Sequence, residues 1–147
     1  MKLPFVLGRI LFGGYFVASG INHLRNREQM QPYAASKGVP QPKLAVTLTA
    51  VPLILGGTSL VLGVKPKWGA LSILGFLGGV SPIMHNFWRS EDPQQRQRDL
   101  TDFMKNMALA GGALALMAID EPWKASVPVG KPTLAHKVRR LSNRIAA

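Results

Sequence analysis

The sequence contains no cysteine. Disulfide bonds, thiolate metal ligands, iron–sulfur clusters and a thiol redox relay within this chain are therefore excluded. Acidic residues are also few: 7 Asp and Glu stand against 18 Lys and Arg, which gives a formal net charge of +11. Such a charge would suit a nucleic-acid-binding protein, but 47% of the residues are hydrophobic, and many of them gather in long uncharged runs. This balance favours a membrane protein that binds no nucleic acid.

Four apolar runs dominate the 147 residues, a length that suits a single domain. Residues 4–24 carry one charge, at Arg9, while residues 44–64, 68–84 and 106–119 carry none. A helix needs about 20 residues, in a range near 17–25, to cross a hydrocarbon core of about 30 Å. The first three runs meet this length directly.

The fourth run is short, but its helix is expected to begin before it. Asp92, Pro93 and Gln95 have the pattern of an N-cap, a proline in the first turn and a capping-box partner. A helix over residues 93–119 would be roughly 40 Å long, with its first turns in the headgroup region. The sequence therefore predicts four membrane-spanning helices.

A cleaved signal peptide is the alternative for the first run. Lys2 precedes the run, and Val17-Ala18-Ser19 resembles a cleavage site. The run has full membrane length, however, and it contains Arg9, both of which favour a retained helix.

Each apolar run contains a pair of adjacent glycines, at 13–14, 56–57, 78–79 and 111–112. Small residues let helices approach closely in lipid, where hydrophobicity contributes little to helix association. The pairs are interpreted first as helix-packing contacts. The alternative is that they form the wall of a groove for a flat ligand.

The connection at residues 25–43 is long enough to hold structure of its own. Asn26 at its start, with Gly38 and Pro40 near its end, predicts a short helix that lies against the bundle or in the headgroup zone. The residues that share its apolar face are Met30, Tyr33 and Ala34.

The predicted fold class is therefore all-α. Residues 1–119 are expected to form a four-helix transmembrane bundle with a short interfacial helix in its first loop, and residues 120–147 a basic cytoplasmic tail. Lys and Arg are slightly more numerous on the side that holds both termini, so the positive-inside rule places both termini in the cytoplasm of a multi-pass plasma-membrane protein.

This topology brings several polar and aromatic residues to one face of the membrane. Polar groups near the hydrocarbon are costly, and they usually pair with one another or line a cavity. The candidate ligand-binding residues are Asn22, His23, His85, Asn86, Trp88, Lys105 and Asn106.

Each candidate also has an interpretation without a ligand. Trp88 suits an interface anchor, Lys105 can extend its amine to the headgroups, and Asn86 and Asn106 can cross-link helices. His85 can be an interfacial histidine with its polar needs met, although its titration near neutral pH favours a function.

Metal and haem sites are less favoured readings of the two histidines. Two histidines are too few for a catalytic zinc unless Glu28, Glu91 or Asp92 joins them, so no metal site is predicted. A bis-histidine haem between His23 and His85 is conceivable, but neither residue lies near mid-membrane.

Several segments resemble the DoxX family of small bacterial integral membrane proteins. The similarity lies in "GRILFGGYFVASGINHL", "LGGTSLVLG", "HNFW" and "FMKNMALAGGAL", in matching order across residues 8–117. The resemblance implies a four-helix bundle in the plasma membrane and an association with redox chemistry, since similar polypeptides occur in a thiosulfate:quinone oxidoreductase. Many members carry a glutamate three residues before the second glycine pair, where this chain has Leu53.

Two functions follow as expectations. The first is a redox accessory subunit that binds a quinone, or docks a membrane or soluble redox partner, at the face bearing His85 and Trp88. Electrons would then come from a partner. The second is a non-enzymatic membrane scaffold or assembly factor, in which the same residues set the depth of the helices in the membrane. Association of the chain with copies of itself, as a homo-oligomer, is a further alternative. A transporter is a weaker alternative, because no charged residue falls at the middle of an apolar run.

Overall fold

The computed structural model describes residues 3–123 and 125–127, and this part of the chain is helical, without strands. The elements are α1 (Leu3–Arg25), α2 (Arg27–Ser36), α3 (Pro42–Leu62), α4 (Pro66–Met84), the short 3₁₀ helix η1 (Phe87–Arg89) and α5 (Pro93–Met117). The expected helices over residues 4–24, 44–64, 68–84 and 93–119 correspond to α1, α3, α4 and α5. Most of the expected tail, residues 128–147, lies outside the described residues.

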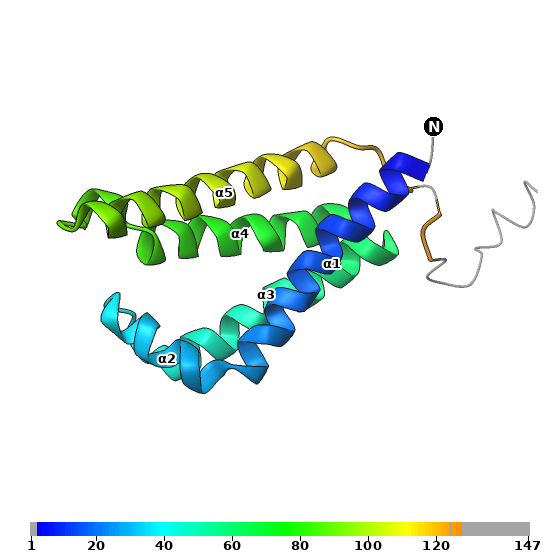
Figure 1. The fold of residues 1–147 in the computed structure, drawn as a ribbon. Helices are drawn as coiled ribbons and strands as arrows, with labels where there is room; N and C mark the ends of the chain where they lie inside the picture. Colours follow the sequence, from blue (N-terminus) through cyan, green and yellow to red (C-terminus); the bar gives the residue numbers. More distant parts are fainter. Residues whose placement is uncertain (1–2, 124, 128–147) are drawn as a thin grey trace, which may run out of the picture.

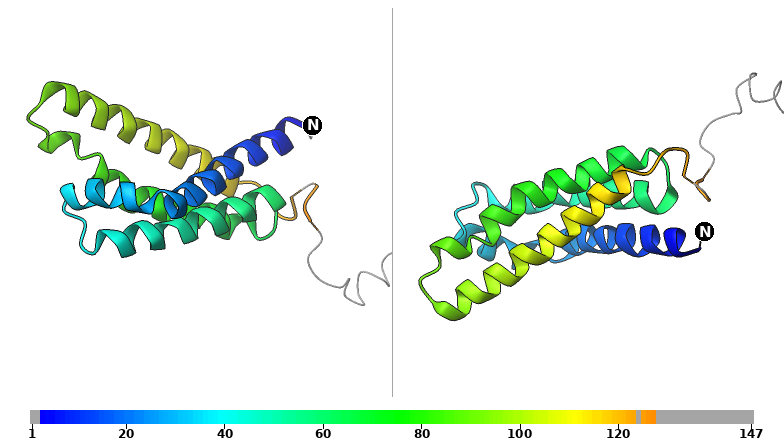
Figure 2. Two further views of the ribbon diagram at one scale, coloured as in Figure 1. Left: turned by 60° about the horizontal axis from the view of Figure 1, so that its bottom comes forward. Right: turned by 90° about the horizontal axis from the view of Figure 1, so that it is seen from above.

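The long helices form two pairs that diverge toward one end of the molecule (Figure 1). α1 packs mainly against α3, α3 also packs against α4, and α4 packs against α5. The N-terminus and residues 120–123 lie at the end where the pairs converge, whereas α2 and the α4–α5 connection lie at the other end (Figures 1 and 2). Polar residues far apart in sequence therefore meet between the diverging ends.

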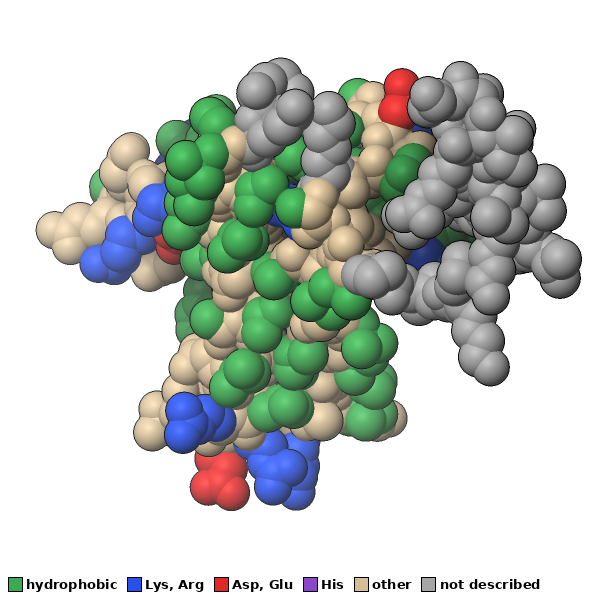
Figure 3. Space-filling model, turned by 90° about the vertical axis from the view of Figure 1, so that its right-hand side faces the viewer, with side chains coloured by type: hydrophobic (Ala, Val, Ile, Leu, Met, Phe, Trp, Pro, Cys, Tyr) green, Lys and Arg blue, Asp and Glu red, His purple; other side chains and the backbone are tan. Residues whose placement is uncertain are grey.

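Within the part of the chain that the structure describes, three segments are long and apolar enough to cross a membrane: Leu3–Arg25, Pro42–Leu62 and Pro66–Arg89. α5 is not among them, because its first turns carry Arg96, Arg98, Asp99 and other charged side chains. Large apolar side chains remain exposed along the spans, including Leu11 and Leu55, as lipid-facing surfaces require. In the view of Figure 3, hydrophobic side chains cover the middle of the molecule, and Lys and Arg lie toward its margins.

The helix expected in the first connection is present as α2. Within α2, the Ala34 side chain is buried, while the Tyr33 side chain is largely exposed. At the start of α5, the Asp92 carboxylate accepts hydrogen bonds from the backbone N–H groups of Gln94 and Gln95, as an N-cap does. The Gln95 side chain does not return to the cap as a capping box requires; it donates to Asp99.

The glycine pairs divide into packing and non-packing positions. A Cβ atom on Gly13 would lie 2.6 Å from the Gly57 carbonyl oxygen, and one on Gly57 would lie 2.5 Å from the Gly13 carbonyl oxygen. α1 and α3 therefore touch through their backbones at this crossing. By contrast, a Cβ atom on Gly78, Gly79 or Gly111 would meet nothing within 4 Å.

The core lies where the two helix pairs converge. Its fully buried side chains come from α1, α3 and α4, among them Phe16, Leu53 and Ile73. Leu53 has 0% of its surface exposed and belongs to this apolar core. A buried carboxylate at this place would need a partner or a proton.

Arg9 forms a hydrogen bond that holds the segment after α5 against the converging end of the helices. Its guanidinium donates from Nη2 to the Ala125 carbonyl oxygen at 2.6 Å, and it lies 5.9 Å from the ring centroids of both Phe5 and Trp123. Trp123 is only 3% exposed and packs edge-on against Phe5. Arg9 is thus a buried structural cation, far from the diverging end.

Candidate functional site

A cavity of about 800 Å³, here called the cleft, lies between the diverging helix pairs. Its walls come from α1, α2, α3 and α4, with His85 and a single residue of α5, Asn106. Most lining side chains are apolar. The polar or hydroxyl-bearing ones are Tyr15, Ser19, His23, Tyr33, Thr49, Ser72, His85 and Asn106.

One wall of the cleft is unusually flat. Gly75 and Gly79 line it from α4, four residues apart and therefore on the same helix face, with Phe76 beside them. A Cβ atom on either glycine would meet nothing within 4 Å, so these positions are not needed for helix packing. The missing side chains leave room for a planar group.

His23 is held by a hydroxyl group of α3. Its Nδ1 lies 3.1 Å from Thr49 Oγ1, and its ring packs edge-on against Phe76 with the centroids 6.0 Å apart. The Thr49 hydroxyl donates in turn to the Val46 carbonyl oxygen at 2.9 Å. The ring orientation of His23 is thus fixed from two sides.

His85 ends α4 and lies between the cleft and Asp99 of α5. Its Nδ1 is buried and has no hydrogen-bond partner among the described residues. The nearest carboxylate oxygen, Asp99 Oδ1, is 4.0 Å away, which is too far for a hydrogen bond but close enough for a strong electrostatic influence. Because Nδ1 is buried on the side of Asp99, Nε2 is the ring nitrogen left for a ligand in the cleft.

Asp99 is the centre of a polar network beside the cleft. It is only 2% exposed, and its carboxylate accepts from Lys37 Nζ at 3.0 Å, Ser90 Oγ at 3.1 Å and Gln95 Nε2 at 2.9 Å. Burial alone would raise the pKa of this carboxyl, but the three hydrogen bonds and the Lys37 charge hold the pKa below its ordinary value. Asp99 is therefore a stable anion at neutral pH.

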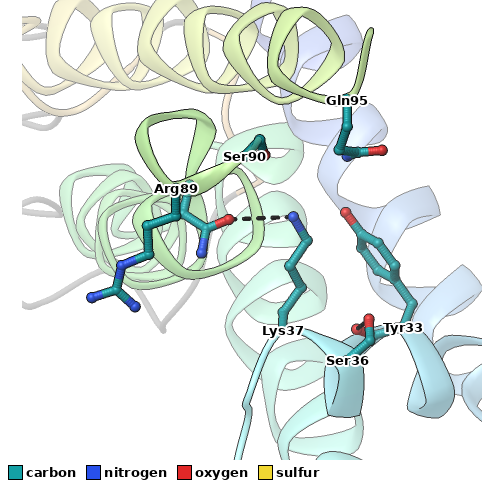
Figure 4. A pocket seen from close by; sticks show the side chains of 7 residues that line it. Tyr33, Ser36, Lys37, Arg89, Ser90 and Gln95 are labelled. Atoms are coloured by element: carbon teal, nitrogen blue, oxygen red, sulfur yellow. Dashed lines mark hydrogen bonds between the residues drawn. The ribbon is translucent and has the colours of Figure 1, made fainter. Parts of the chain in front are cut away.

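A second, polar pocket of about 490 Å³ adjoins this network and shares Tyr33 with the cleft. Lys37 extends into it and donates to Asn86 Oδ1 at 3.3 Å (Figure 4). Tyr33 and Ser36 lie on one side of Lys37 and Ser90 on the other, while the Arg89 guanidinium turns away (Figure 4). The full lining is Tyr33, Ser36, Lys37, Asn86, Arg89, Ser90 and Gln95.

The residues expected at the site come from the end of α1, the α4–α5 connection and the middle of α5, and only some of them line a cavity. His23, His85 and Asn106 line the cleft, and Asn86 lines the polar pocket. The remaining candidates lie on outward surfaces. Asn22 is exposed and accepts a hydrogen bond from Asn26, Lys105 pairs with Asp102 at 3.0 Å, and Trp88 is 51% exposed beside Phe87 and Phe103.

Sequence reasoning did not single out Lys37, Thr49 or Asp99. Asp99 stands among charged residues in the first turns of α5, where an exposed position is the ordinary expectation. The spacing of Gly75 and Gly79 was the one available signal, because two small residues four positions apart share a helix face. Among the described residues, no group of three or more His, Cys, Asp or Glu could hold a metal ion.

Comparisons with known proteins place this geometry in a family context. The DoxX family model matches residues 5–86, which include most of α1, all of α2 to α4 and both His23 and His85. The inner membrane protein YphA of Escherichia coli strain K12 is 26% identical over 122 residues, which cover 83% of this chain and 86% of that protein. No solved structure matches the chain.

Proposed function

The chain belongs to the DoxX family of integral membrane proteins, and on that premise we propose that it is a redox accessory that binds a lipid-soluble quinone in the cleft. Its ring, in either redox state, would lie between α4 and the α1–α3 pair. The single observation that carries this proposal is the cleft itself, a cavity of about 800 Å³ with apolar walls and a few polar groups. Ligand sites typically have volumes of about 300–1,000 Å³ and this kind of lining.

The lining gives each part of a quinone a partner. The planar ring matches the flat wall at Gly75 and Gly79, where a side chain would occupy the same space. The oxygen atoms of the ring can form hydrogen bonds with imidazole and amide groups, which His23, His85 and Asn106 supply. Trp88 and Lys105, which lie outside the cleft, have no contact role in this proposal.

The membrane topology around the site is part of the same proposal. α5 would be a fourth membrane-spanning helix whose first turns stay in the headgroup region, so that both termini face the cytoplasm across the plasma membrane. The name of the inner-membrane relative supports this location. The chain has no cysteine, so the electrons would be delivered by a partner protein.

The test compares two neighbouring glycines. Gly79 lines the cleft and Gly78 does not, yet a Cβ atom on either would meet nothing within 4 Å. We expect the protein purified from its membrane to retain quinone, measured by solvent extraction and ultraviolet absorbance. Gly79→Leu should lose most of it, and Gly78→Leu should keep it. Equal retention by both variants, or no quinone in any preparation, would contradict the proposal.

A scaffold function is the second candidate, and one surface feature favours it. Phe87, Trp88 and Phe103 form a cluster of edge-on aromatic contacts outside the cleft, with Trp88 51% exposed. Exposed aromatic groups of this kind bind partner proteins or anchor in the headgroup region. A protein that never retains quinone, but loses a partner on Trp88→Ala, would be a scaffold.

A further inference from the structure

We propose that the cleft selects the reduced, hydroxyl-bearing form of its ligand, a quinol, over the oxidised quinone. This inference rests on the proposed function, because it concerns the redox state of the same ligand. Its basis is an inventory of hydrogen atoms in the cleft wall. The hydroxyl groups of Tyr33, Thr49 and Ser72 already donate to backbone carbonyls, whereas those of Tyr15 and Ser19 can either donate to a ligand or accept from it. The two neutral histidines of the wall therefore decide which form of the ligand is favoured.

The first part of the inventory is the tautomer of His23. A threonine hydroxyl has one hydrogen atom, and that of Thr49 is donated to the Val46 carbonyl oxygen. With that hydrogen assigned to the Val46 carbonyl, Thr49 Oγ1 accepts in its contact with His23 Nδ1, and we infer a hydrogen on Nδ1. A neutral His23 is then left with Nε2 as a hydrogen-bond acceptor.

The second part concerns His85. The Asp99 carboxylate lies 4.0 Å from Nδ1, and its negative charge favours a hydrogen over a lone pair on that nitrogen. The charge of Asp102 acts in the same sense, and the charges of Lys37 and Lys105 oppose it. Asp99 is the group found in contact with Nδ1, so we assign the hydrogen of the neutral His85 ring to Nδ1. Nε2 is then the acceptor, as in His23.

The third part is the set of hydroxyl groups. Ser72 Oγ donates to the Pro52 carbonyl oxygen at 3.3 Å, and Tyr33 Oη donates to the Met84 carbonyl oxygen at 3.4 Å. Pro52 itself has no N–H to offer to the carbonyl of Leu48, one turn earlier in α3. Leu48 and Pro52 are both lining residues of the cleft, and the Leu48 carbonyl lacks its usual helical donor there.

A ligand that meets acceptors must bring hydrogen atoms. A quinol has two hydroxyl donors, whereas a quinone has only carbonyl acceptors, which would face the lone pairs of the histidines. Asn106, Tyr15 and Ser19 can serve either form because an amide or a hydroxyl group both donates and accepts. One buried acceptor left unpaired weakens binding by about tenfold or more, which sets the scale of the expected selectivity.

The experiment uses three compounds of one ring shape: duroquinone, duroquinol and the dimethyl ether of duroquinol. Their dissociation constants are measured by anaerobic equilibrium dialysis against the full chain in lipid nanodiscs. We expect duroquinol to bind about tenfold more tightly than the other two. Such a preference would raise the reduction potential of the bound couple by about 30 mV.

Equal binding of duroquinone and duroquinol, or tighter binding of the quinone, would overturn the inference and leave the proposed function standing. Binding of none of the three compounds would overturn both. The dimethyl ether distinguishes hydrogen bonding from ring shape, because it keeps the aromatic ring of the quinol and lacks the hydroxyl hydrogens. An ether that binds as tightly as the quinol would also overturn the inference.

Two neighbouring threonines provide the matched variants. Thr49→Val removes the group that fixes the His23 tautomer, so the preference for duroquinol should fall toward equality. Thr47 also donates to a backbone carbonyl, that of Lys43, at 2.8 Å, but it does not line the cleft. Thr47→Val should therefore keep the full preference. A Thr49→Val variant that also keeps it would contradict the assigned tautomer.

Discussion

Lys37 Nζ lies 3.0 Å from Asp99 Oδ2, and this ion pair connects the C-terminal end of α2 with α5. The two side chains are 13% and 2% exposed. Few other contacts hold the diverging helix pairs together here. Those found are the hydrogen bonds from Tyr33 to the Met84 carbonyl and from Lys37 to Asn86. The ion pair is thus the main contact that links the two helix pairs beside the polar pocket.

Asp99→Ala is expected to destabilise the protein by about 3–5 kcal/mol, because it leaves the buried Lys37 ammonium without its anion. Asp102→Ala is the matched control. Asp102 also lies in α5 and pairs with a lysine at 3.0 Å, but that pair is 67% and 45% exposed, so its loss should cost at most about 1 kcal/mol. Denaturant unfolding in mixed micelles measures both. Equal losses for the two variants would contradict the structural role of Asp99.

The same network predicts a loss of stability in acid. Burial raises the pKa of Asp99, but the hydrogen bonds from Lys37, Gln95 and Ser90 outweigh this, so the folded pKa lies below the ordinary value of 3.8. As pH falls through 3.8, the unfolded chain takes up a proton before the folded chain does, and the free energy of unfolding decreases. The contribution is fully present above that pH and is lost through the folded pKa.

The measurement is the free energy of unfolding between about pH 5 and pH 3, where a normal carboxyl begins to titrate. Asp99→Asn should have a lower stability at the upper end and a shallower decline toward the lower end. Parallel curves for the variant and the unchanged protein would show that other carboxyl groups cause the acid sensitivity.

The helices themselves could be predicted from the sequence because their signals are local. The uncharged run at residues 68–84 and the run at residues 4–24 differ from α4 and α1 by one or two residues at their ends. Asp92 and Pro93 likewise mark the start of α5 through their own chemistry, an acceptor for free N–H groups and a fixed backbone angle.

The cleft could be predicted only in part, because it depends on the angle between helices and on helix phase. The order of the helices alone predicts that His23 and His85 lie near one another, and both line the cleft. The burial of Asp99 follows from the side of α5 that meets Lys37, and no sequence pattern reports this. The same limitation explains why Trp88, expected beside a ligand, points outward.

The crossing of α1 and α3 predicts opposite effects for two glycines, Gly57 of α3 and Gly14 of α1. Gly57→Ala would place a Cβ atom 2.5 Å from the Gly13 carbonyl oxygen, so the helices must separate and stability should fall by roughly 1–3 kcal/mol. Gly14→Ala meets nothing within 4 Å and should be neutral or stabilising by up to about 1 kcal/mol, since alanine favours helix. Thermal unfolding in detergent compares them. A harmless Gly57→Ala would exclude the close backbone contact.

The membrane topology can be tested with unusual clarity because the chain has no cysteine of its own. Each single cysteine substitution therefore gives one labelling site for a membrane-impermeant maleimide. Glu28 in α2 and Glu91 before α5 lie at the diverging end, while Lys67 at the start of α4 and Glu121 after α5 lie at the converging end. All four side chains are exposed.

We expect Glu28→Cys and Glu91→Cys to react in intact cells, and Lys67→Cys and Glu121→Cys to react only after the membrane is opened. The labelling of Glu121→Cys shows whether α5 spans the membrane, because Glu121 follows both the polar first turns and the apolar half of that helix. Labelling of Glu121→Cys together with Glu91→Cys would mean that α5 lies along the surface. A full reversal of the pattern would keep four spans and invert the orientation, which would place the Asp99 network on the cytoplasmic side.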